Sequence, residues 1–321
     1  MRGSCLDSEL SSGSVSAALP EVSVLVVGYK SLDYIGRCLR GAMASARGAD
    51  FEFLFIDCSN DGSEAFVREQ FPKVRVLPYQ GNLGFARGNN VLAAASRGHR
   101  LLLLNPDAFA QGDELSALLT LAKLHADASA WGAVTVLPSG EIDGGSIQPM
   151  LGMTPLLLAL VGLARLRPGA ADPMRLKPQS VPVLSGAFMM VDAQVWRALD
   201  GFDQRFFMYA EEVDLCKRIA DAGGTLVVDP RIRMLHDTGS GARRTPSRML
   251  NRARGNATFY DKHYGPVHST LCKTLLWLHA ATRELYGRVR GREEYVASYS
   301  AVMRQRSEWW NGWPSPHAKE R

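Results

Sequence analysis

Asp107 is the carboxylate whose surroundings predict most about this chain. It follows four leucines, at 101–104, and the pair Asn105-Pro106. The leucines predict a strand buried on both faces of a sheet, and Pro106 ends it because proline cannot donate a ladder hydrogen bond and disfavours helical geometry at Asn105. Asp107 should then lie at a strand's carboxyl end, where open α/β sheets bind ligands and a carboxylate can hold a divalent cation with its phosphates. The alternative is that Asp107 caps the helix expected from residue 112.

Three carboxylates follow a run of aromatic residues. Glu211, Glu212 and Asp214 come directly after residues 206–209, of which three are aromatic. A helix that begins near Glu211 would place Asp214 on the same face as Glu211 and turn Glu212 elsewhere. Aromatic neighbours that exclude water raise the pKa of a carboxylate, which a general base working near neutral pH requires. The alternative is that acidic side chains simply favour the first turn of a helix.

Three further side chains suit a nucleotide. Asp57 follows an apolar run and could accept a hydrogen bond from a base or a ribose, or could close an Asx turn with Ser59 or Asn60. Arg87 lies near a helix start, where it could reach a diphosphate, although a surface arginine needs no such role. His236 follows a strand and could bind a cation or a phosphate, although a single histidine is usually structural.

Positive charge is concentrated in one part of the chain. The formal net charge of the 321 residues is +5, and residues 231–254 contain seven arginines against one acid, Asp237. The arginines are Arg231, Arg233, Arg243, Arg244, Arg248, Arg252 and Arg254. Such a block suits the phosphates of a nucleotide, a lipid head group or a nucleic acid, and the alternative is a solvated surface.

Alternating strands and helices are expected to position these residues. Strands are predicted at 22–27, 51–56, 74–77, 101–104, 131–137 and 183–191, with an edge strand at 225–230. Helical spacing separates the first four of them, so these βαβ units predict a parallel sheet with right-handed crossovers. The loops after residues 27, 56 and 104 then open at one edge and line one crevice. Residues 138–182, punctuated by proline and glycine, are predicted to form a loop or lid.

Length and composition fit one large α/β domain with appendages, or two domains. Five scattered cysteines without a C-x-x-C pair predict a reducing compartment and neither a disulfide framework nor a zinc site. No signal peptide is expected, and residues 1–20 are predicted to be disordered. The apolar run 150–164 is too short to span a bilayer and predicts a buried helix or one that lies in the membrane surface.

The motifs occur in the order that family 2 glycosyltransferases show. The chain resembles in particular the bacterial rhamnosyltransferase-like branch with the GT-A fold. The stretches that carry the resemblance are VVGYK (26–30), IDCSNDGS (56–63), NLGFARGNN (82–90), LNPD (104–107), SGAFM (185–189), GFD (201–203), FFMYAEEVDL (206–215) and His236. The resemblance covers residues 22–264.

The resemblance implies an architecture and a reaction. The fold would be α/β and Rossmann-like, with a mostly parallel central sheet flanked by helices at 21–265 and a helical C-terminal extension at 266–321. The reaction would be an inverting transfer of a sugar from a dTDP-, UDP- or GDP-sugar to a glycan or lipid-linked acceptor. The best guess for the donor is dTDP-rhamnose, and the cofactor would be Mg²⁺ or Mn²⁺. A cytoplasmic enzyme without a nucleic-acid partner is expected. The extension could contact the cytoplasmic face of the inner membrane, or pack as a helical layer or dimer contact.

The resemblance also assigns roles to individual residues. The base would be Glu212, with Glu211 and Asp214 as alternatives, and the metal ligands would be Asp107 and His236. The donor would be bound by Val27, Gly28, Tyr29, Asp57, Gly84, Arg87, Asn105 and Asp107. The acceptor side would comprise Gly186, Phe207, Tyr209 and Glu211. The chain departs from the branch at Gly28 and Lys30, where threonine and asparagine are usual, and at Glu212, where aspartate is usual.

Two other functions are compatible with the same residues. A nucleotidyltransferase could use the crevice for a nucleoside triphosphate, although no glycine-rich, lysine-bearing loop follows the first strand. A module without catalysis could bind RNA or anionic lipid through residues 231–254, and its binding would depend steeply on salt.

Overall fold

The computed structural model describes residues 19–146, 148–163, 172, 174–237 and 245–314. The tail expected to be disordered therefore lies almost entirely outside the described residues. The strands are β1 (Val22–Gly28), β2 (Phe51–Asp57), β3 (Val74–Leu77), β4 (Arg100–Leu104), β5 (Ala108–Phe109), β6 (Ala130–Val136), β7 (Gln179–Ser180), β8 (Phe188–Asp192) and β9 (Leu226–His236). The helices are α1 (Leu32–Ser45), α2 (Ser63–Gln70), α3 (Gly84–Ala95), α4 (Glu114–Leu124), α5 (Met153–Leu160), α6 (Ala193–Ala198), α7 (Glu211–Asp221), α8 (Pro246–His263), α9 (Pro266–Val289), α10 (Glu293–Arg304) and α11 (Arg306–Trp309).

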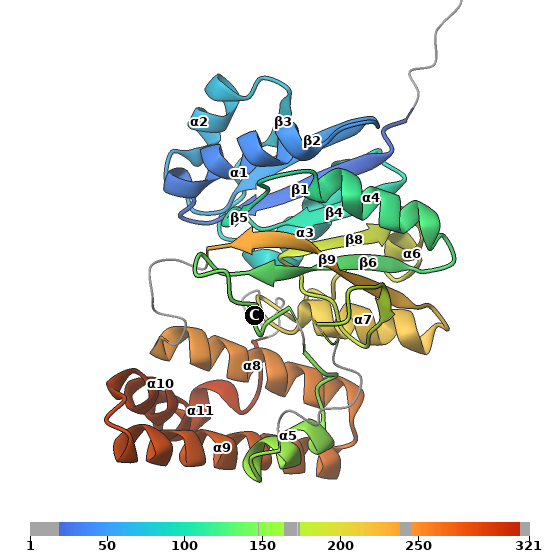
Figure 1. Cartoon of the computed structure of the whole chain (residues 1–321). Coiled ribbons are helices and arrows are strands. Elements are labelled where there is room, and N and C mark those ends of the chain that lie inside the picture. Colours follow the sequence, from blue (N-terminus) through green and yellow to red (C-terminus); the bar gives the residue numbers. More distant parts are fainter. Residues whose placement is uncertain (1–18, 147, 164–171, 173, 238–244, 315–321) are drawn as a thin grey trace, which may run out of the picture.

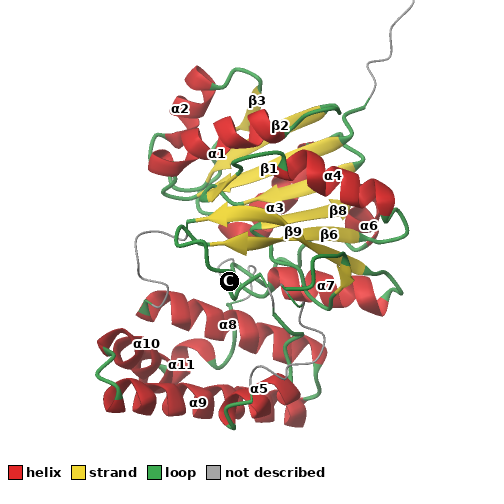
Figure 2. Ribbon diagram, in the orientation of Figure 1, coloured by secondary structure: helices red, strands yellow, loops and turns green. Residues whose placement is uncertain are grey.

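A single sheet organises the N-terminal part of the chain. Its strand order is β3-β2-β1-β4-β8-β6-β9-β5, with β7 paired to β9. β3, β2, β1 and β4 are parallel neighbours, as their spacing predicts, and β6 and β9 are also parallel. β8 is antiparallel to both β4 and β6. The expected α/β fold, with a mostly parallel sheet between helices, is confirmed (Figure 2).

Both faces of the sheet are covered. Val24 and Val26 of β1 belong to a core that includes residues of α1, α2 and α4, whereas Leu25 and Val27 belong to a second core with α3, α6 and α7. Figure 1 shows α1 and α4 in front of the sheet and α3 behind it. Burial on both faces explains why the central strands are continuously apolar in sequence.

The C-terminal helices form a separate layer. α8, α9, α10 and α11 enclose their own apolar cluster, which includes Leu250, Ala280, Val302 and Trp309. Figure 1 shows this layer beyond α7, with α5 lying against α9. The expected helical C-terminal extension is thus present, and it packs as a layer on α8.

Three expectations about elements were wrong. The segment 225–230 is not an edge strand, because this part of β9 pairs with β6 on one side and with β7 on the other, and β9 continues to His236. Pro230 is accommodated there by a register shift opposite Ala133 and Val134. β8 begins only at Phe188, since a turn at Ser185 precedes it. The segment 138–182 is not devoid of regular structure, because it contains α5 and β7.

Candidate active site

Strand pairing brings Asp107 and His236 together. β5 and β9 are antiparallel with Ala108 opposite His236, and the Asp237 N–H donates to the Asp107 carbonyl at 2.9 Å. His236 Nε2 consequently lies 3.2 Å from Asp107 Oδ1 and 3.5 Å from Asn105 Nδ2. Asp107 does not cap the following helix, because α4 begins at Glu114 with Asp113 at its N-cap position. The two residues that the resemblance assigns to a metal are therefore neighbours.

Asp143 completes this cluster and was not anticipated from the sequence. The Asp143 N–H donates to the Thr135 carbonyl at 2.8 Å, which places its carboxylate Oδ2 3.4 Å from His236 Nδ1. Burial alone would lower the pKa of His236, but the hydrogen bonds and charges of Asp107 and Asp143 raise it to about 9. Asp143 precedes Gly144 in a stretch that is typical of an ordinary turn, so the sequence did not identify Asp143 as a site residue.

The cluster suits a divalent cation that takes only a few of its ligands from the protein. Asp107 offers a carboxylate oxygen and His236 an imidazole nitrogen on the same side, while Asp143 faces the other ring nitrogen. Such an outer carboxylate fixes the tautomer and orientation of a metal-binding histidine. No group of three or more acidic, histidine or cysteine ligands occurs within the described ranges. A cation here would take its other ligands from substrate phosphates and water, as Mg²⁺ commonly does.

The tips of β1 and β2 form the neighbouring part of the same edge. Gly28 pairs with Asp57 in register, and Asp57 Oδ1 accepts from both the N–H and the hydroxyl of Ser59, each at 2.8 Å. The Asx turn is thus present, and it fixes the buried carboxylate. Tyr29 is half exposed. A Cβ at Gly28 would lie 2.8 Å from the Phe55 ring, which accounts for glycine where the family usually has threonine.

Close backbone packing holds the aromatic loop 206–210 in place. The Phe85 N–H donates to the Phe207 carbonyl at 2.9 Å, and Gly84, with φ of +70°, leaves no room for a side chain against Phe207. Tyr209 and Ala210 adopt left-handed φ values of +66° and +70° immediately before α7. Two consecutive non-glycine residues in this region are strained, and strain of this kind concentrates at functional sites.

Of the two glutamates that begin α7, Glu211 is buried and Glu212 is half-buried, and their surroundings differ. Burial raises the pKa of Glu211 well above its ordinary value, and the charge of Glu212 raises it further. Glu212 Oε1 accepts from Gln148 Nε2 at 3.3 Å. Burial also raises the pKa of Glu212, although hydrogen bonds from its backbone and from Gln148 and the charge of Arg252 oppose this. The Oε2 atom of each glutamate is buried without a hydrogen-bond partner among the described residues.

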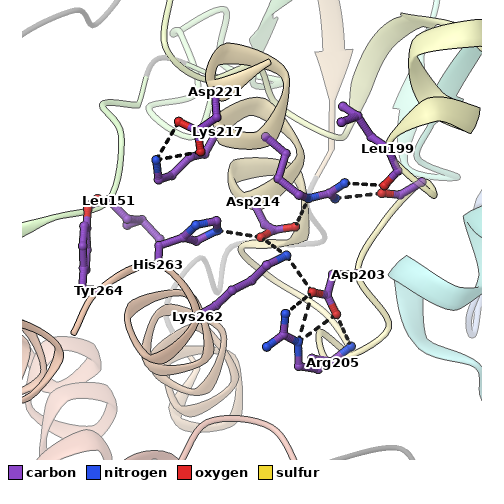
Figure 3. A network of polar contacts seen from close by, with 12 residues as sticks. Leu151, Leu199, Asp203, Arg205, Asp214, Lys217, Asp221, Lys262, His263 and Tyr264 are labelled. Carbon is purple, nitrogen blue, oxygen red and sulfur yellow. Dashed lines mark hydrogen bonds and ion pairs between the residues drawn. The ribbon is translucent and has the colours of Figure 1, made fainter. Parts of the chain in front are cut away.

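Asp214 has a different environment from the glutamates. Its carboxylate lies 2.6 Å from Lys262 Nζ, 2.7 Å from His263 Nε2 and 2.8 Å from Arg218 Nε, and Lys262 also contacts Asp203 (Figure 3). Burial alone would raise the pKa of Asp214, but the His263 hydrogen bond and the charges of Arg218 and Lys262 lower it. Asp214 therefore joins α7 to α8 as a buried carboxylate with three side-chain partners.

The remaining acceptor-side and donor-side residues lie around the same elements. A Cβ at Gly186 would lie 3.5 Å from the Glu212 Cβ, so glycine leaves this approach to the glutamate open. Arg87 is exposed on the first turn of α3, and Gly88 lets that turn pack directly on Val27.

The arginines of 231–254 do not act as one surface. Arg231 pairs with Asp229 at 2.6 Å, and Arg254 pairs with Glu308 at 2.9 Å. Arg243 and Arg244 lie outside the described residues. Arg252 makes no ion pair with the described residues and lines a cavity instead. The block is therefore divided among different local roles.

The mostly parallel sheet, covered by helices on both faces, has the architecture of the GT-A fold. Residues 20–255 match the family described as glycosyltransferase like family 2, and the chain belongs to that family. Its resemblance to the rhamnosyltransferase-like branch is also confirmed, since the proteins to which it is similar include rhamnosyltransferases.

Three known proteins illustrate the similarity. The N-acetylglucosaminyl-diphospho-decaprenol L-rhamnosyltransferase of Mycobacterium tuberculosis is 29% identical over 299 residues, which span 84% of this chain and 95% of that protein. Rhamnosyltransferase WbbL of Escherichia coli is 24% identical over 235 residues, 67% of this chain and 83% of that one. The mannosyltransferase PcManGT of Pyrobaculum calidifontis, solved with GDP-Man and Mn²⁺, shares the fold with a TM-score of 0.57 at 15% identity, covering 91% of this chain and 86% of that chain.

Proposed function

We propose that this family 2 glycosyltransferase moves rhamnose from dTDP-rhamnose to a hydroxyl of a lipid-linked acceptor, with inversion at the anomeric carbon. The observation that carries the proposal is the 3.2 Å approach of His236 to Asp107 at the carboxyl edge of the sheet. Support for the sugar and the acceptor comes from the M. tuberculosis relative, whose name specifies both.

The donor would lie across the strand tips. Asp57 and Tyr29 would bind the base and ribose, beside Val27 and Gly28, while Arg87 would reach the diphosphate. Gly84 and Asn105 would line the same crevice. Asp107 and His236 would hold Mg²⁺ or Mn²⁺. When bound, this cation would neutralise the negative charge that develops on the departing nucleoside diphosphate.

Glu212 is the proposed base. It is less buried than Glu211, one of its oxygens has no partner among the described residues, and its raised pKa suits proton transfer near neutral pH. Glu212 would accept the proton of the acceptor hydroxyl as that oxygen attacks the anomeric carbon opposite the leaving diphosphate. Gly186, Phe207, Tyr209 and Glu211 would shape the acceptor side. A single base suffices for this in-line displacement.

Peripheral contact with a membrane is part of the proposal. None of the helices in the described ranges combines the length and apolar composition that a bilayer crossing needs. α9 nevertheless exposes an apolar stripe at helical spacing, and α5 beside it exposes Leu157 and Val161. The stripe consists of Val267, Leu271, Leu278, Leu285 and Val289. Such a face suits the interfacial region of a bilayer, where a lipid-linked acceptor resides.

A panel of nucleotide sugars tests the reaction. The chain would be incubated with dTDP-rhamnose, UDP-sugars or GDP-sugars and a lipid-linked N-acetylglucosaminyl diphosphate, with and without Mn²⁺. We expect acceptor-dependent and Mn²⁺-dependent release of dTDP from dTDP-rhamnose, and an inverted linkage in the product. Release of a nucleoside diphosphate from another nucleotide sugar would identify a different donor. Release of inorganic diphosphate from a nucleoside triphosphate would favour a nucleotidyltransferase.

A further inference from the structure

A cavity lies among the C-terminal helices and the segment that contains α5. It is lined by α5, α8, α9, α10 and the segment before α5, and its volume is about 230 Å³. Tyr264 Oη donates to the Leu151 carbonyl at 2.6 Å, which fixes that segment to the end of α8 (Figure 3). For comparison, a cavity of about 150 Å³ accommodates benzene. The space is therefore large enough for part of a substrate.

Two polar residues of the cavity lining interact with the proposed base. Gln148 lines the cavity and donates to Glu212 Oε1 at 3.3 Å. Arg252 also lines it, and the charge of Arg252 acts on the Glu212 carboxylate. Because Arg252 makes no ion pair with the described residues, its guanidinium is available to an anionic group of a ligand. The polar end of a ligand would thus lie beside Arg252 and Gln148, the residues that connect the cavity to Glu212.

The rest of the lining is largely apolar. α5 contributes Leu156 and Ala159, and α9 and α10 contribute Leu276, Ala280 and Val302. An apolar chain would remove this surface from water. A free polysaccharide would leave its hydroxyl groups without partners against the same side chains.

We infer that this cavity binds the phosphate-linked apolar chain of the acceptor, with the phosphate near Arg252 and the first isoprenoid units between α5 and α9. The inference rests on the proposed function and selects a lipid-linked acceptor over a free glycan. It also connects the base to the apolar stripe, since α5 and α9 line the cavity with one face and expose apolar residues on the other.

Acceptors that differ in the group attached to the diphosphate test the inference. With the donor that the panel selects, N-acetylglucosaminyl diphosphate would be supplied as its farnesyl ester or its methyl ester. We expect the KM of the farnesyl acceptor to be at least about 10-fold lower than that of the methyl acceptor. Even partial burial of a farnesyl chain stabilises the complex by more than the free energy that corresponds to a 10-fold change in affinity. Equal KM values would overturn the cavity assignment alone. No nucleoside diphosphate release with either acceptor or any donor would contradict the proposed function itself.

Two variants test whether the difference in KM between the two acceptors depends on the cavity. Ala159→Phe should fill the apolar part and raise the KM of the farnesyl acceptor about 10-fold without changing that of the methyl acceptor. Ala44→Phe, on the exposed side of α1, is the matched control and should change neither. If Ala159→Phe raises both KM values equally or neither, the cavity does not bind the chain.

Binding without catalysis gives an independent measurement. Farnesyl phosphate should bind the wild-type chain in calorimetry more tightly than farnesol or inorganic phosphate, since the cavity offers both a cationic and an apolar part. Arg252→Gln should weaken the binding of farnesyl phosphate about 5-fold or more, yet leave the binding of farnesol unchanged, because only the phosphate meets the guanidinium. Unchanged binding of farnesyl phosphate by Arg252→Gln, or phosphate binding as tight as that of farnesyl phosphate, would overturn the inference.

Discussion

At the scale of single residues, three neighbouring carboxylates have three different environments. Glu211 is deeply buried, Glu212 keeps one oxygen near Gln148, and Asp214 is paired with Arg218, Lys262 and His263. Sequence spacing placed all three on one helical turn but could not rank them as bases. The ranking depends on α8, whose Lys262 and His263 reach Asp214 across more than forty positions of sequence.

Removing the proposed base should separate binding from chemistry. Glu212→Gln should reduce kcat by at least about 10²-fold while the Kd for dTDP stays within a factor of about 2, because proton transfer is lost and the donor edge is unchanged. Single-turnover kinetics and calorimetry would measure the two quantities. Glu211→Gln is the matched control, and a larger loss in kcat for that variant would reassign the base.

Glu211 should make stability depend on pH in a particular direction. Its folded-state pKa lies above its unfolded value, so the unfolded chain releases its proton first and folding is progressively weakened as pH rises through that interval. Glu211→Gln should therefore raise Tm relative to wild type at about pH 9 but not at about pH 5. Thermal unfolding at both pH values measures this. If the Tm difference between Glu211→Gln and the wild type were the same at both pH values, the pKa of Glu211 would not be raised by folding.

At the scale of elements, the sequence predicted the first half of the sheet well. The runs ending at Val27, Ile56 and Leu104 are apolar on both faces, and their spacing leaves room for one helix each, so a parallel order follows. The antiparallel insertion of β8 and the pairing of β5 with β9 could not be predicted, since both depend on contacts between segments far apart in sequence. Asp143 was missed for the same reason: only the β6–β9 pairing brings its turn to His236.

Asp143 is a positioning residue for His236, and its removal should weaken metal binding without removing a ligand. Asp143→Asn should raise the Kd for Mn²⁺, measured in the presence of dTDP, by about 10-fold to 100-fold because the imidazole loses its orienting carboxylate. Electron paramagnetic resonance of free Mn²⁺ would report this independently of turnover. Asp127→Asn, on the exposed turn after α4, should leave the Kd unchanged. An unaltered Kd for Asp143→Asn would show that the contact is incidental.

At the scale of the whole molecule, the described chain has two ends with different chemistry. The sheet edge gathers charged and polar groups, while α5 and α9 expose apolar side chains. Figure 1 shows α8 between the sheet and α9. The resemblance implied a helical extension at 266–321, but whether an apolar face there is buried or exposed is decided by packing on α8.

The apolar stripe should bind vesicles. A double substitution, Leu278→Glu with Leu285→Glu, should reduce the partition of the chain onto vesicles with anionic lipid by at least about 10-fold, because two charges replace apolar side chains at the interface. Sedimentation with the vesicles measures this partition. Leu124→Glu, at a more exposed leucine on α4, is the control. Equal binding by all variants would exclude this face as the membrane contact.

The central claim is that one edge of the sheet, bearing Asp57, Asp107 and His236, holds the nucleotide donor within reach of Glu212. A crystal structure of the chain with dTDP-rhamnose and Mn²⁺, using Glu212→Gln to prevent turnover, tests it most directly. We predict the base beside Asp57, the cation on Asp107 and His236, and the anomeric carbon facing position 212. A nucleotide bound elsewhere, or a cation away from Asp107 and His236, would contradict the account.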